Sequence, residues 1–391
     1  MLSIDEARGV VLGATRPLAP ETVPLADALD RVLAAPVTAA FDVPRFVNSA
    51  MDGFALQSGP ADRTLLIVGE SRAGAPSSAA VGPGEAVRIS TGAAVPEGAD
   101  AVVMVERTRE QDGEVLVEAE TTAGQNLRHP GEDMRAGSVV IAPGTQIGPA
   151  ELGVAASAGI ATLRCFRRPR VVVLATGDEL VAPGEPLAPG QIHDSNALTL
   201  TALARRAGAE VVHAGEVPDT PQSTEAAVRA ALTVADVVLC SGGVSVGPHD
   251  HVKPALLAAG VEERFWRVAL RPGKPTWFGV RQGQLAFGLP GNPVSAMVTF
   301  VLFARPALLA LQGADPGMPR ERKRLTRALA RHAGRDECVR VCLDGDEATP
   351  TGPQGSHVLT SMLGADALAL VPRGEGELPA GSEIEVERLP R

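Results

Sequence analysis

Tyrosine is absent from the sequence, and aromatic residues make up only 3% of its 391 residues. Valine, leucine and alanine must therefore fill most of the interior. Lysine is also scarce, because Lys253, Lys274 and Lys323 are the only lysines among 36 basic residues. The formal net charge of −10 argues against an extended surface for nucleic acid or for an anionic membrane, while a local basic site remains compatible with it. We expect no nucleic-acid partner and no membrane partner.

Cysteine is equally rare, and its four positions include no CxxC pair. On a strand, Cys338 and Cys342 would lie about 13 Å apart on one face, which is too far for a disulfide. The N-terminal segment MLSIDEARGV lacks the charged-then-apolar pattern of a signal peptide, and no uninterrupted run of about 18 apolar residues occurs. These features predict a soluble cytoplasmic protein with reduced thiols.

The length predicts about two to four domains, and the composition changes character along the chain. Residues 1–40 and 139–166 predict a helical connecting domain, with a capping box formed by Ser3 and Glu6 and an alanine-rich helix in PAELGVAASAGIATL. We expect these two helices to pack together. Residues 41–138 contain the short runs EAVRIS, DAVVMVE and GEVLVEA between Gly and Pro turns, which indicate an inserted β-rich domain.

Residues 167–312 alternate buried strands with helices, which predicts a three-layer α/β domain with a parallel-rich sheet. Its expected strands include RVVVLATG, EVVHAGEV, DVVLCSGG and QLAFGLPG. From residue 313 to 391 the runs ECVRVCL, HVLTSML, ALALVPR and SEIEVERL indicate short strands and a β-barrel-like domain. The fold class is therefore multidomain α/β plus β.

Unusual loops follow three of the expected parallel strands. They are ATGDEL at residues 175–180, SGGVSVGPHD at 241–250 and GLPGNPVSA at 288–296. In such a sheet the carboxyl ends of the strands meet at one edge, and glycine there lets the backbone approach an anion closely. The three loops together predict a cradle for phosphate or for the polar edge of a ring. Tight strand-to-helix turns without a ligand are the alternative.

Carboxylates accompany these loops: Asp178 and Glu179 after the first strand, Asp219 after the second and Asp250 at the end of the glycine-rich loop. Asp219 and Asp250 are each also placed to cap a helix. Several carboxylates around an anion cradle would repel the ligand unless a divalent cation such as Mg²⁺ lies between them. We therefore hypothesise a metal-bridged phosphoanhydride or phosphate ester.

Basic residues gather in WRVALRPGKPTWF, where alternation would place Arg267 and Arg271 on one strand face, with Lys274 beside a Pro-Gly turn. A solvated edge strand is the alternative. In GLPGNP, two prolines stiffen a turn around Asn292. The inserted segment offers Arg128 and Asp133 within NLRHPGEDMRAG, which read equally well as parts of a turn.

Seven of these motifs, in matching order along the whole chain, carry a family resemblance. VNSAMDGFAL, TGAAVPEGADAVV, HPGEDMRAG, LATGDEL, SGGVSVGPHD, LRPGKPTWFG and GLPGNPVSA together resemble molybdopterin molybdenumtransferase, the family that includes the C-terminal domain of gephyrin. Two departures stand out: Phe54 where a tyrosine is common, and Arg271 where lysine is frequent. The resemblance implies insertion of molybdenum from molybdate into adenylylated molybdopterin, release of AMP, and Mg²⁺ or another divalent cation.

The resemblance also implies roles for particular residues. Positions tied to activity are Asp52, Thr91, Glu179, Asp219 and Asp250, with Asp219 and Asp250 as the metal ligands. Substrate-binding positions are Arg128, Asp133, Thr176, Gly177, Ser241, Gly242, Gly243, Ser245, Gly247, Arg271, Lys274, Pro290, Gly291, Asn292 and Pro293. The family forms homodimers in which the α/β domain of one subunit and the inserted domain of the other share a cleft. Expected partners are molybdopterin adenylyltransferase and molybdoenzyme-maturation proteins.

Two other functions remain open. Molybdopterin adenylyltransferase shares the α/β domain but consists of that domain alone, whereas this chain continues on both sides of it. A scaffold of the gephyrin type would need a further domain and linker, and no segment of this sequence encodes them. Two assays separate the two enzymes. A molybdenumtransferase converts adenylylated molybdopterin with molybdate, whereas an adenylyltransferase converts molybdopterin with ATP.

Overall fold

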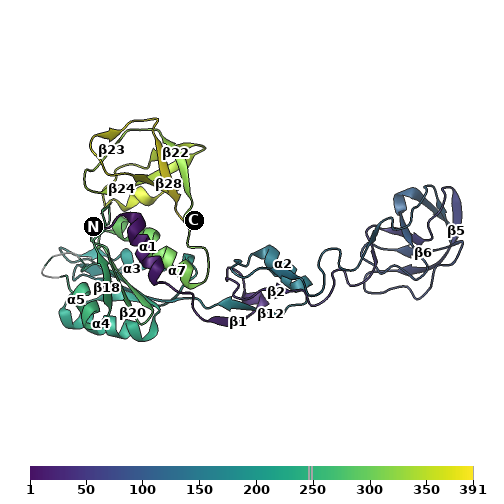
Figure 1. Ribbon diagram of the computed structural model, residues 1–391, viewed down its shortest axis with the longest axis horizontal. Helices are drawn as coiled ribbons and strands as arrows, with labels where there is room; N and C mark the ends of the chain where they lie inside the picture. Colours follow the sequence, from purple (N-terminus) through teal and green to yellow (C-terminus); the bar gives the residue numbers. More distant parts are fainter. Residues whose placement is uncertain (245–246, 248–249, 391) are drawn as a thin grey trace.

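The computed structural model describes residues 1–391 apart from 245–246, 248–249 and 391. The molecule is elongated: one end holds both termini, an α/β region and a β-barrel, the other end holds the β-rich insertion, and a connecting segment lies between them (Figure 1). The insertion therefore projects away from the α/β region of its own chain.

The α/β region is built on a six-stranded sheet in the order β16-β13-β17-β21-β20-β18. Four neighbours are parallel: β16 (Glu210–Val217), β13 (Arg170–Thr176), β17 (Val237–Ser241) and β21 (Gln284–Leu289). At the other edge β20 (Trp277–Arg281) runs antiparallel to β21, and β18 (Glu262–Trp266) runs antiparallel to β20. The parallel-rich sheet expected from the sequence is confirmed.

Alternate residues of the central strands enter two different cores. Val171, Val173 and Leu239 face a cluster with α3 (Asn196–Arg206), α6 (Pro293–Thr299) and α7 (Arg305–Leu311). Val172 and Leu174 face a second cluster with α4 (Pro221–Val234) and α5 (Val252–Ala258). Because side chains alternate across a strand, continuous apolar runs mean burial on both faces, which is the three-layer arrangement predicted.

The helical stretch Pro293–Leu311 combines α6, a π-helical turn η3 (Phe300–Ala304) and α7. By length and composition this stretch is apolar enough to cross a membrane, but 78% of its most apolar window is buried inside the protein. It forms the centre of the larger core cluster, as core helices of globular domains do.

Helix α1 (Ile4–Ala14) begins with the capping box predicted: the Ser3 hydroxyl accepts from the amide of Glu6, and the Glu6 carboxylate accepts from the amide of Ser3. The expectation that this helix packs on the alanine-rich helix is wrong. Ile4, Ala7 and Val11 form one apolar stripe that packs into the α/β core, and α1 lies beside α7 (Figure 1).

The connecting segment is less helical than predicted. Beside α2 (Pro149–Ser157) it contains β1 (Pro20–Pro24) paired with β12 (Thr162–Phe166), and β2 (Val37–Thr38) paired with β11 (Val139–Ile141). Proline disrupts the interior of a helix, and Pro20 and Pro24 are here the first and last residues of strand β1. Helix α2 packs against these strands in its own small core.

The insertion is a six-stranded sheet in the order β7-β4-β6-β5-β9-β8. The runs EAVRIS, DAVVMVE and GEVLVEA become β6 (Glu85–Ile89), β7 (Ala101–Met104) and β9 (Glu114–Val117), as predicted. The remaining strands are β4 (Gly53–Leu56), β5 (Arg63–Ser71) and β8 (Thr108–Gln111). The pair β3 (Asn48–Ser49) and β10 (Leu127–Arg128) leads into this sheet.

The C-terminal region is a closed five-stranded barrel. Its strands are β24 (Asp336–Asp344), β25 (Glu347–Pro350), β22 (Arg320–Leu325), β28 (Glu383–Arg388) and β26 (Ala367–Val371), which pairs back to β24. The run HVLTSML is a correction, because it contains a 3₁₀ turn at Leu359–Met362 rather than a strand. There the Ser361 hydroxyl accepts a bond from the buried Arg340 guanidinium, which anchors the turn against the barrel.

Candidate functional site

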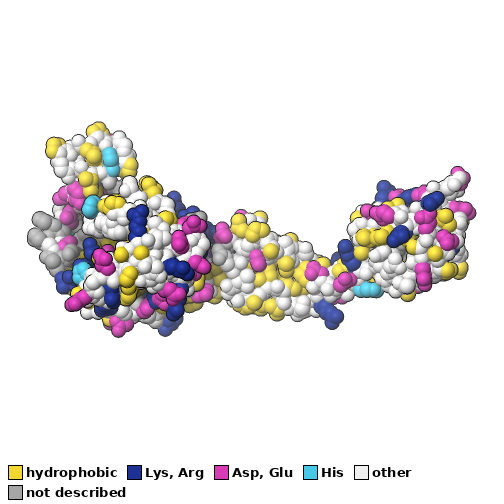
Figure 2. Space-filling view, turned by 90° about the horizontal axis from the view of Figure 1, so that it is seen from above, with side chains coloured by type: hydrophobic (Ala, Val, Ile, Leu, Met, Phe, Trp, Pro, Cys, Tyr) yellow, Lys and Arg dark blue, Asp and Glu magenta, His cyan; other side chains and the backbone are white. Residues whose placement is uncertain are grey.

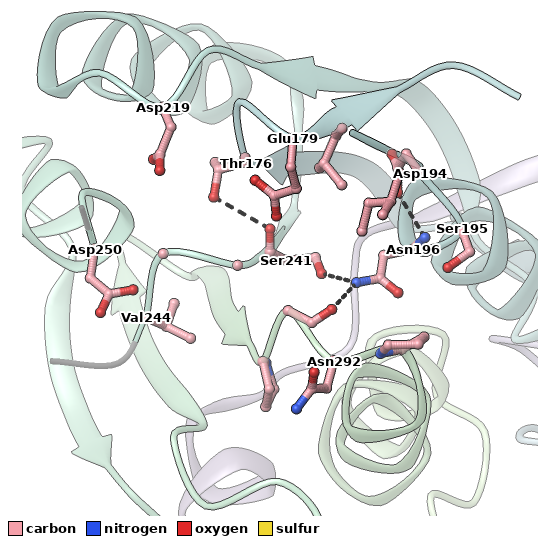
Figure 3. Close-up of a pocket in the computed structure, with 18 of the residues that line it drawn as sticks. Thr176, Glu179, Asp194, Ser195, Asn196, Asp219, Ser241, Val244, Asp250 and Asn292 are labelled. Atoms are coloured by element: carbon pink, nitrogen blue, oxygen red, sulfur yellow. Dashed lines mark hydrogen bonds between the residues drawn. The ribbon is translucent and has the colours of Figure 1, made fainter. Parts of the chain in front are cut away.

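A pocket of about 730 Å³ lies at the carboxyl edge of the α/β sheet (Figure 3). Its walls come from the ends of four neighbouring strands. Thr176 and Ser241 are the last residues of β13 and β17. The other lining residues of these strand ends are Gly177 and Glu179 after β13, Asp219 after β16, Gly242–Val244, Gly247 and Asp250 after β17, and Pro290–Pro293 after β21. The predicted convergence of the three loops is confirmed. The site lies beside β13, where the chain order reverses direction across the sheet.

Glycine is required at the floor of this pocket. Gly242 has φ +90, and a Cβ there would lie 2.6 Å from the carbonyl oxygen of Thr176. Gly243 has φ +62, and its Cβ would lie 2.9 Å from a methyl group of Val252. Both the backbone conformation and the space exclude larger residues, so the loop is a close-packed cradle.

The capping alternative for Asp219 and Asp250 is not what the structure contains. Thr220 caps α4 by accepting from the amide of Ser223. Asp250 instead accepts a hydrogen bond from the amide of Gly247, inside the glycine-rich loop. The backbone amide of Asp219 donates to Asp178 at 3.0 Å, which links the loops after β16 and β13.

Glu179, Asp219 and Asp250 line the same pocket, with Asp219 and Asp250 toward one end of it (Figure 3). Among the described residues, no group of three or more His, Cys, Asp or Glu side chains is close enough to hold a metal ion. Carboxylate oxygens nevertheless suit Mg²⁺, which proteins often bind through one or two carboxylates together with phosphates of the substrate. The donor set therefore fits a cation that arrives with a phosphorylated ligand.

Asn196 is a pocket residue that the sequence reading missed. Its amide nitrogen donates to the Ser241 hydroxyl at 2.9 Å and to the carbonyl of Gly291 at 2.6 Å (Figure 3). Asp194 in turn accepts from the backbone amides of Asn196 and Ala197. Asp194 therefore binds two amides at the start of α3, while Asn196 ties two pocket loops together.

The barrel also reaches the pocket. His357 is one of the lining residues, and the neighbouring Ser356 hydroxyl accepts from the side-chain amide of Asn292 at 2.9 Å. Arg340 holds this loop through the carbonyl of Gly355 and through the Ser361 hydroxyl. A second histidine, His193 on β15 (Ile192–His193), also lines the pocket. The sequence alone did not identify either histidine as a site residue, because neither belongs to a motif with recognisable chemistry.

The basic segment is arranged differently from the expectation. Arg267 has φ +73, which ends β18 at Trp266, while Arg271 belongs to β19 (Leu270–Arg271), which pairs with β24 of the barrel. Arg267 and Arg271 therefore do not share a strand face. Lys274 and Arg271 are exposed, and Pro275, next to Lys274, lines the pocket. The Arg271 guanidinium lies 3.7 Å from the carboxylate of Glu337.

The candidate residues of the insertion form two groups far from this pocket. Asp52 accepts from the backbone amide of Thr91 at 2.7 Å, so the structure brings these two together. Arg128 and Asp133 line a separate hollow together with Asn48 and Glu132. Ser245 lies outside the described residues. None of the insertion residues lines the pocket of its own chain.

Three family comparisons cover nearly the whole chain. Residues 2–159 match the family described as MoeA N-terminal region (domain I and II). Residues 172–310 match the probable molybdopterin binding domain. Residues 322–389 match the MoeA C-terminal region (domain IV).

Full-length relatives agree with these matches. A molybdopterin molybdenumtransferase of Haemophilus influenzae is 38% identical, with 99% of this chain and 98% of that protein covered. Molybdopterin molybdenumtransferase 2 of Mycobacterium tuberculosis is 39% identical, with 99% of both chains covered. A crystal structure of a molybdopterin biosynthesis moea protein from Pyrococcus horikoshii superposes with a TM-score of 0.85 at 32% identity over 99% of each chain.

Proposed function

The chain belongs to the molybdopterin molybdenumtransferase family, and we propose that it inserts molybdenum from molybdate into adenylylated molybdopterin, releasing AMP, at the pocket on the carboxyl edge of its sheet. It is a transferase of molybdenum-cofactor biosynthesis. The observation that carries the location is the meeting of a glycine cradle with three carboxylates from three different loops. Such a combination suits an anionic substrate that binds together with a cation.

The metal chemistry is part of this proposal. Asp219 and Asp250 would hold a divalent cation, which when bound neutralises negative charge on the phosphoanhydride and on the leaving AMP. One carboxylate oxygen of Asp250 accepts a hydrogen bond from the amide of Gly247. This bond fixes the orientation of the carboxylate that would hold the cation. Glu179 adds a third negative charge to the same pocket and favours cation binding further.

Other residues of the chain bind and orient the substrate. The cradle at Gly242 and Gly243 lets the anhydride approach the backbone, and the bonds of Asn196 fix the two loops on either side. Lys274 is an exposed cation next to Pro275 of the pocket wall, and Arg271 is exposed on β19 three residues before Lys274. We assign both to the capture of molybdate, a dianion. In an acidic protein such local cations raise the concentration of an oxyanion at the entrance.

The substrate site is completed, in this proposal, by the insertion of a second subunit. Asp52 and Thr91 are adjacent to each other but sit at the far end of their own chain (Figure 1). In the view of Figure 2 the connecting segment carries few charged side chains, and Leu29 and Val139 in it are 45% and 59% exposed. An apolar, weakly charged face supports contact with a second copy in a homodimer.

We place the reaction in the cytoplasm, between molybdopterin adenylyltransferase, which would supply the substrate, and molybdoenzyme-maturation proteins, which would take the product. The face in Figure 2 intersperses acidic and basic side chains, which supports the expectation of no nucleic-acid surface. Adenylyltransferase activity is the competing function, since the α/β region alone would serve it.

A pair of substrate assays tests the proposal. Purified protein with Mg²⁺ should release AMP from adenylylated molybdopterin in a molybdate-dependent manner and form molybdenum cofactor. The same protein should not consume ATP in the presence of molybdopterin. ATP consumption would favour the adenylyltransferase, and turnover of neither pair would favour a binding or scaffold role.

Asp250→Asn tests the metal role within this assay. Asparagine retains an oxygen that accepts from Gly247, so the loop should keep its shape, but the charge that attracts the cation is lost. We expect the variant to fold normally and to need a much higher Mg²⁺ concentration, with AMP release at ordinary Mg²⁺ reduced by about tenfold or more. An unchanged Mg²⁺ dependence would remove Asp250 from the metal site.

A further inference from the structure

Trp266 makes a directed contact with the glycine-rich loop from outside the pocket. Its indole Nε1 donates to the carbonyl oxygen of Val244 at 3.1 Å. Val244 is 2% exposed and lines the pocket directly after Gly243. A buried carbonyl needs a partner, so this bond both satisfies Val244 and sets the position of the backbone there.

The same indole contacts the helix that follows the loop. Lys253, at the start of α5, places its ammonium group 4.0 Å from the centroid of the Trp266 ring. The Lys253 ammonium is also 2.9 Å from the carboxylate of Glu263, which lies three residues before Trp266 on β18. One side chain therefore holds the strand-side flank of the loop at Val244 and the helix-side flank at Lys253.

The residue after Trp266 reinforces this arrangement. Arg267 has φ +73, a backbone conformation that is uncommon for a residue with a side chain. Its amide donates to the carbonyl of Thr276 at 2.9 Å, and its guanidinium carbon lies 4.0 Å from the centroid of the Trp266 ring. The strained backbone thus directs a second cation onto the same indole.

Between the two flanks lies the carboxylate that the proposed function uses most. The amide of Val252 donates to the carbonyl of Gly243 at 3.1 Å, which closes the base of the loop, and Asp250 binds the amide of Gly247 within it. We propose that Trp266 is a positioning residue that clamps both flanks of the glycine-rich loop and so holds Asp250 and the cradle in place for the substrate. This inference rests on the proposed function only for the identity of the ligand.

Trp277 supplies a matched control. It is fully buried, packs in the same core cluster, and its indole nitrogen donates to Glu263 at 2.8 Å rather than to the loop. Replacing either tryptophan by phenylalanine keeps an aromatic ring and removes one N–H donor. Only Trp266→Phe removes a bond to the pocket loop.

The experiment compares wild-type protein, Trp266→Phe and Trp277→Phe by two measurements. The first is the dissociation constant of AMP, used as the probe with saturating Mg²⁺. The second is amide hydrogen exchange at Asp250 and Val252, whose amides donate to Gly247 and Gly243, referenced to the β17 amide of Leu239. We expect Trp266→Phe to weaken AMP binding by about three- to tenfold, the worth of one hydrogen bond, and to accelerate exchange at the two loop amides relative to Leu239.

The control separates the possible outcomes. Trp277→Phe removes a donor to Glu263, the partner of Lys253, but keeps the bond from Trp266 to Val244. It should therefore lower the melting temperature and change AMP binding and relative loop exchange less than Trp266→Phe does. Equal loop exchange in both variants would overturn the clamp, as would equal AMP affinity in a protein that binds AMP. If wild-type protein binds no AMP, the proposed ligand is wrong, and loop exchange alone then decides the clamp.

Discussion

In the homodimer proposed above, Asp52→Ala and Asp250→Ala should each abolish activity, yet activity should return when subunits of the two variants are exchanged. Asp52 lies in the insertion, where it binds the amide of Thr91, and Asp250 lies in the pocket of the α/β region. The connecting segment separates these two parts within one chain (Figure 1). In the proposed homodimer, the two carboxylates would meet in one cleft only if they come from different subunits.

The expected recovery follows from the two-fold symmetry. A mixed dimer has one cleft with both lesions and one cleft with neither. Random exchange of equal amounts makes about half of the dimers mixed, so about a quarter of all clefts are intact and about a quarter of wild-type activity should return. If each subunit used its own insertion, every cleft would keep one lesion.

The assay is molybdate-dependent AMP release before and after exchange, with exchange verified by two affinity tags recovered on one dimer. A third variant that carries both substitutions, mixed with wild type, is the control, because its mixed dimers hold one lesion in each cleft. That mixture should fall to about a quarter of wild-type activity after random exchange. Verified exchange of the single variants without recovery would refute the shared cleft.

The remaining predictions concern single side chains. Lys274→Ala should raise the molybdate concentration for half-maximal AMP release, because an exposed cation beside the pocket is lost; an unchanged half-saturation point would exclude Lys274 from oxyanion capture. Asn196→Leu should lower the free energy of unfolding by about 1–3 kcal/mol, because the carbonyl of Gly291 and the Ser241 hydroxyl lose their donor. Urea denaturation measures this loss, and a stability equal to wild type would show that the bonds between the two loops are dispensable. Burial raises the pKa of the Cys240 thiol to about 12, so iodoacetamide at about pH 8 should label Cys240 only after the protein unfolds. Peptide mass spectrometry measures the labelling, and rapid labelling of the folded protein would contradict the buried position.

Local patterns in the sequence were enough to predict the elements that build the site. Continuous apolar runs marked the parallel strands β13, β17 and β21, and chain direction then placed their loops at one edge of the sheet. Glycine at 242 and 243 was informative because a positive φ in a crowded floor admits no other residue. Asp219 and Asp250 followed from their positions at the strand ends, although the capping alternative needed the structure to exclude it.

Other features depended on contacts that no local pattern carries. Asn196 looked like a cap, and its bonds to Ser241 and Gly291 span 45 and 95 residues of sequence. His357 joins the pocket because the barrel packs over the end of β21, and α1 joins the α/β core at Leu302, 294 residues beyond Arg8. Periodicity in the sequence identifies which face of a helix or strand is apolar. It does not identify the element that this face packs against, because many other helices and strands of the chain offer an equally apolar surface.

The sequence by itself determined the parallel strands of the α/β region, the main strands of the insertion and the order of the pocket loops, because those depend on neighbours a few residues apart. It did not determine the connecting segment, which contains strands where helix was predicted, or the run HVLTSML, which contains a 3₁₀ turn. Only the tertiary structure decided that Arg267 turns away from Arg271, that Trp266 contacts both flanks of the pocket loop, and that Asp52 lies far from Asp250. Each of these depends on how separate elements pack, and packing free energy is shared among residues distant in the chain.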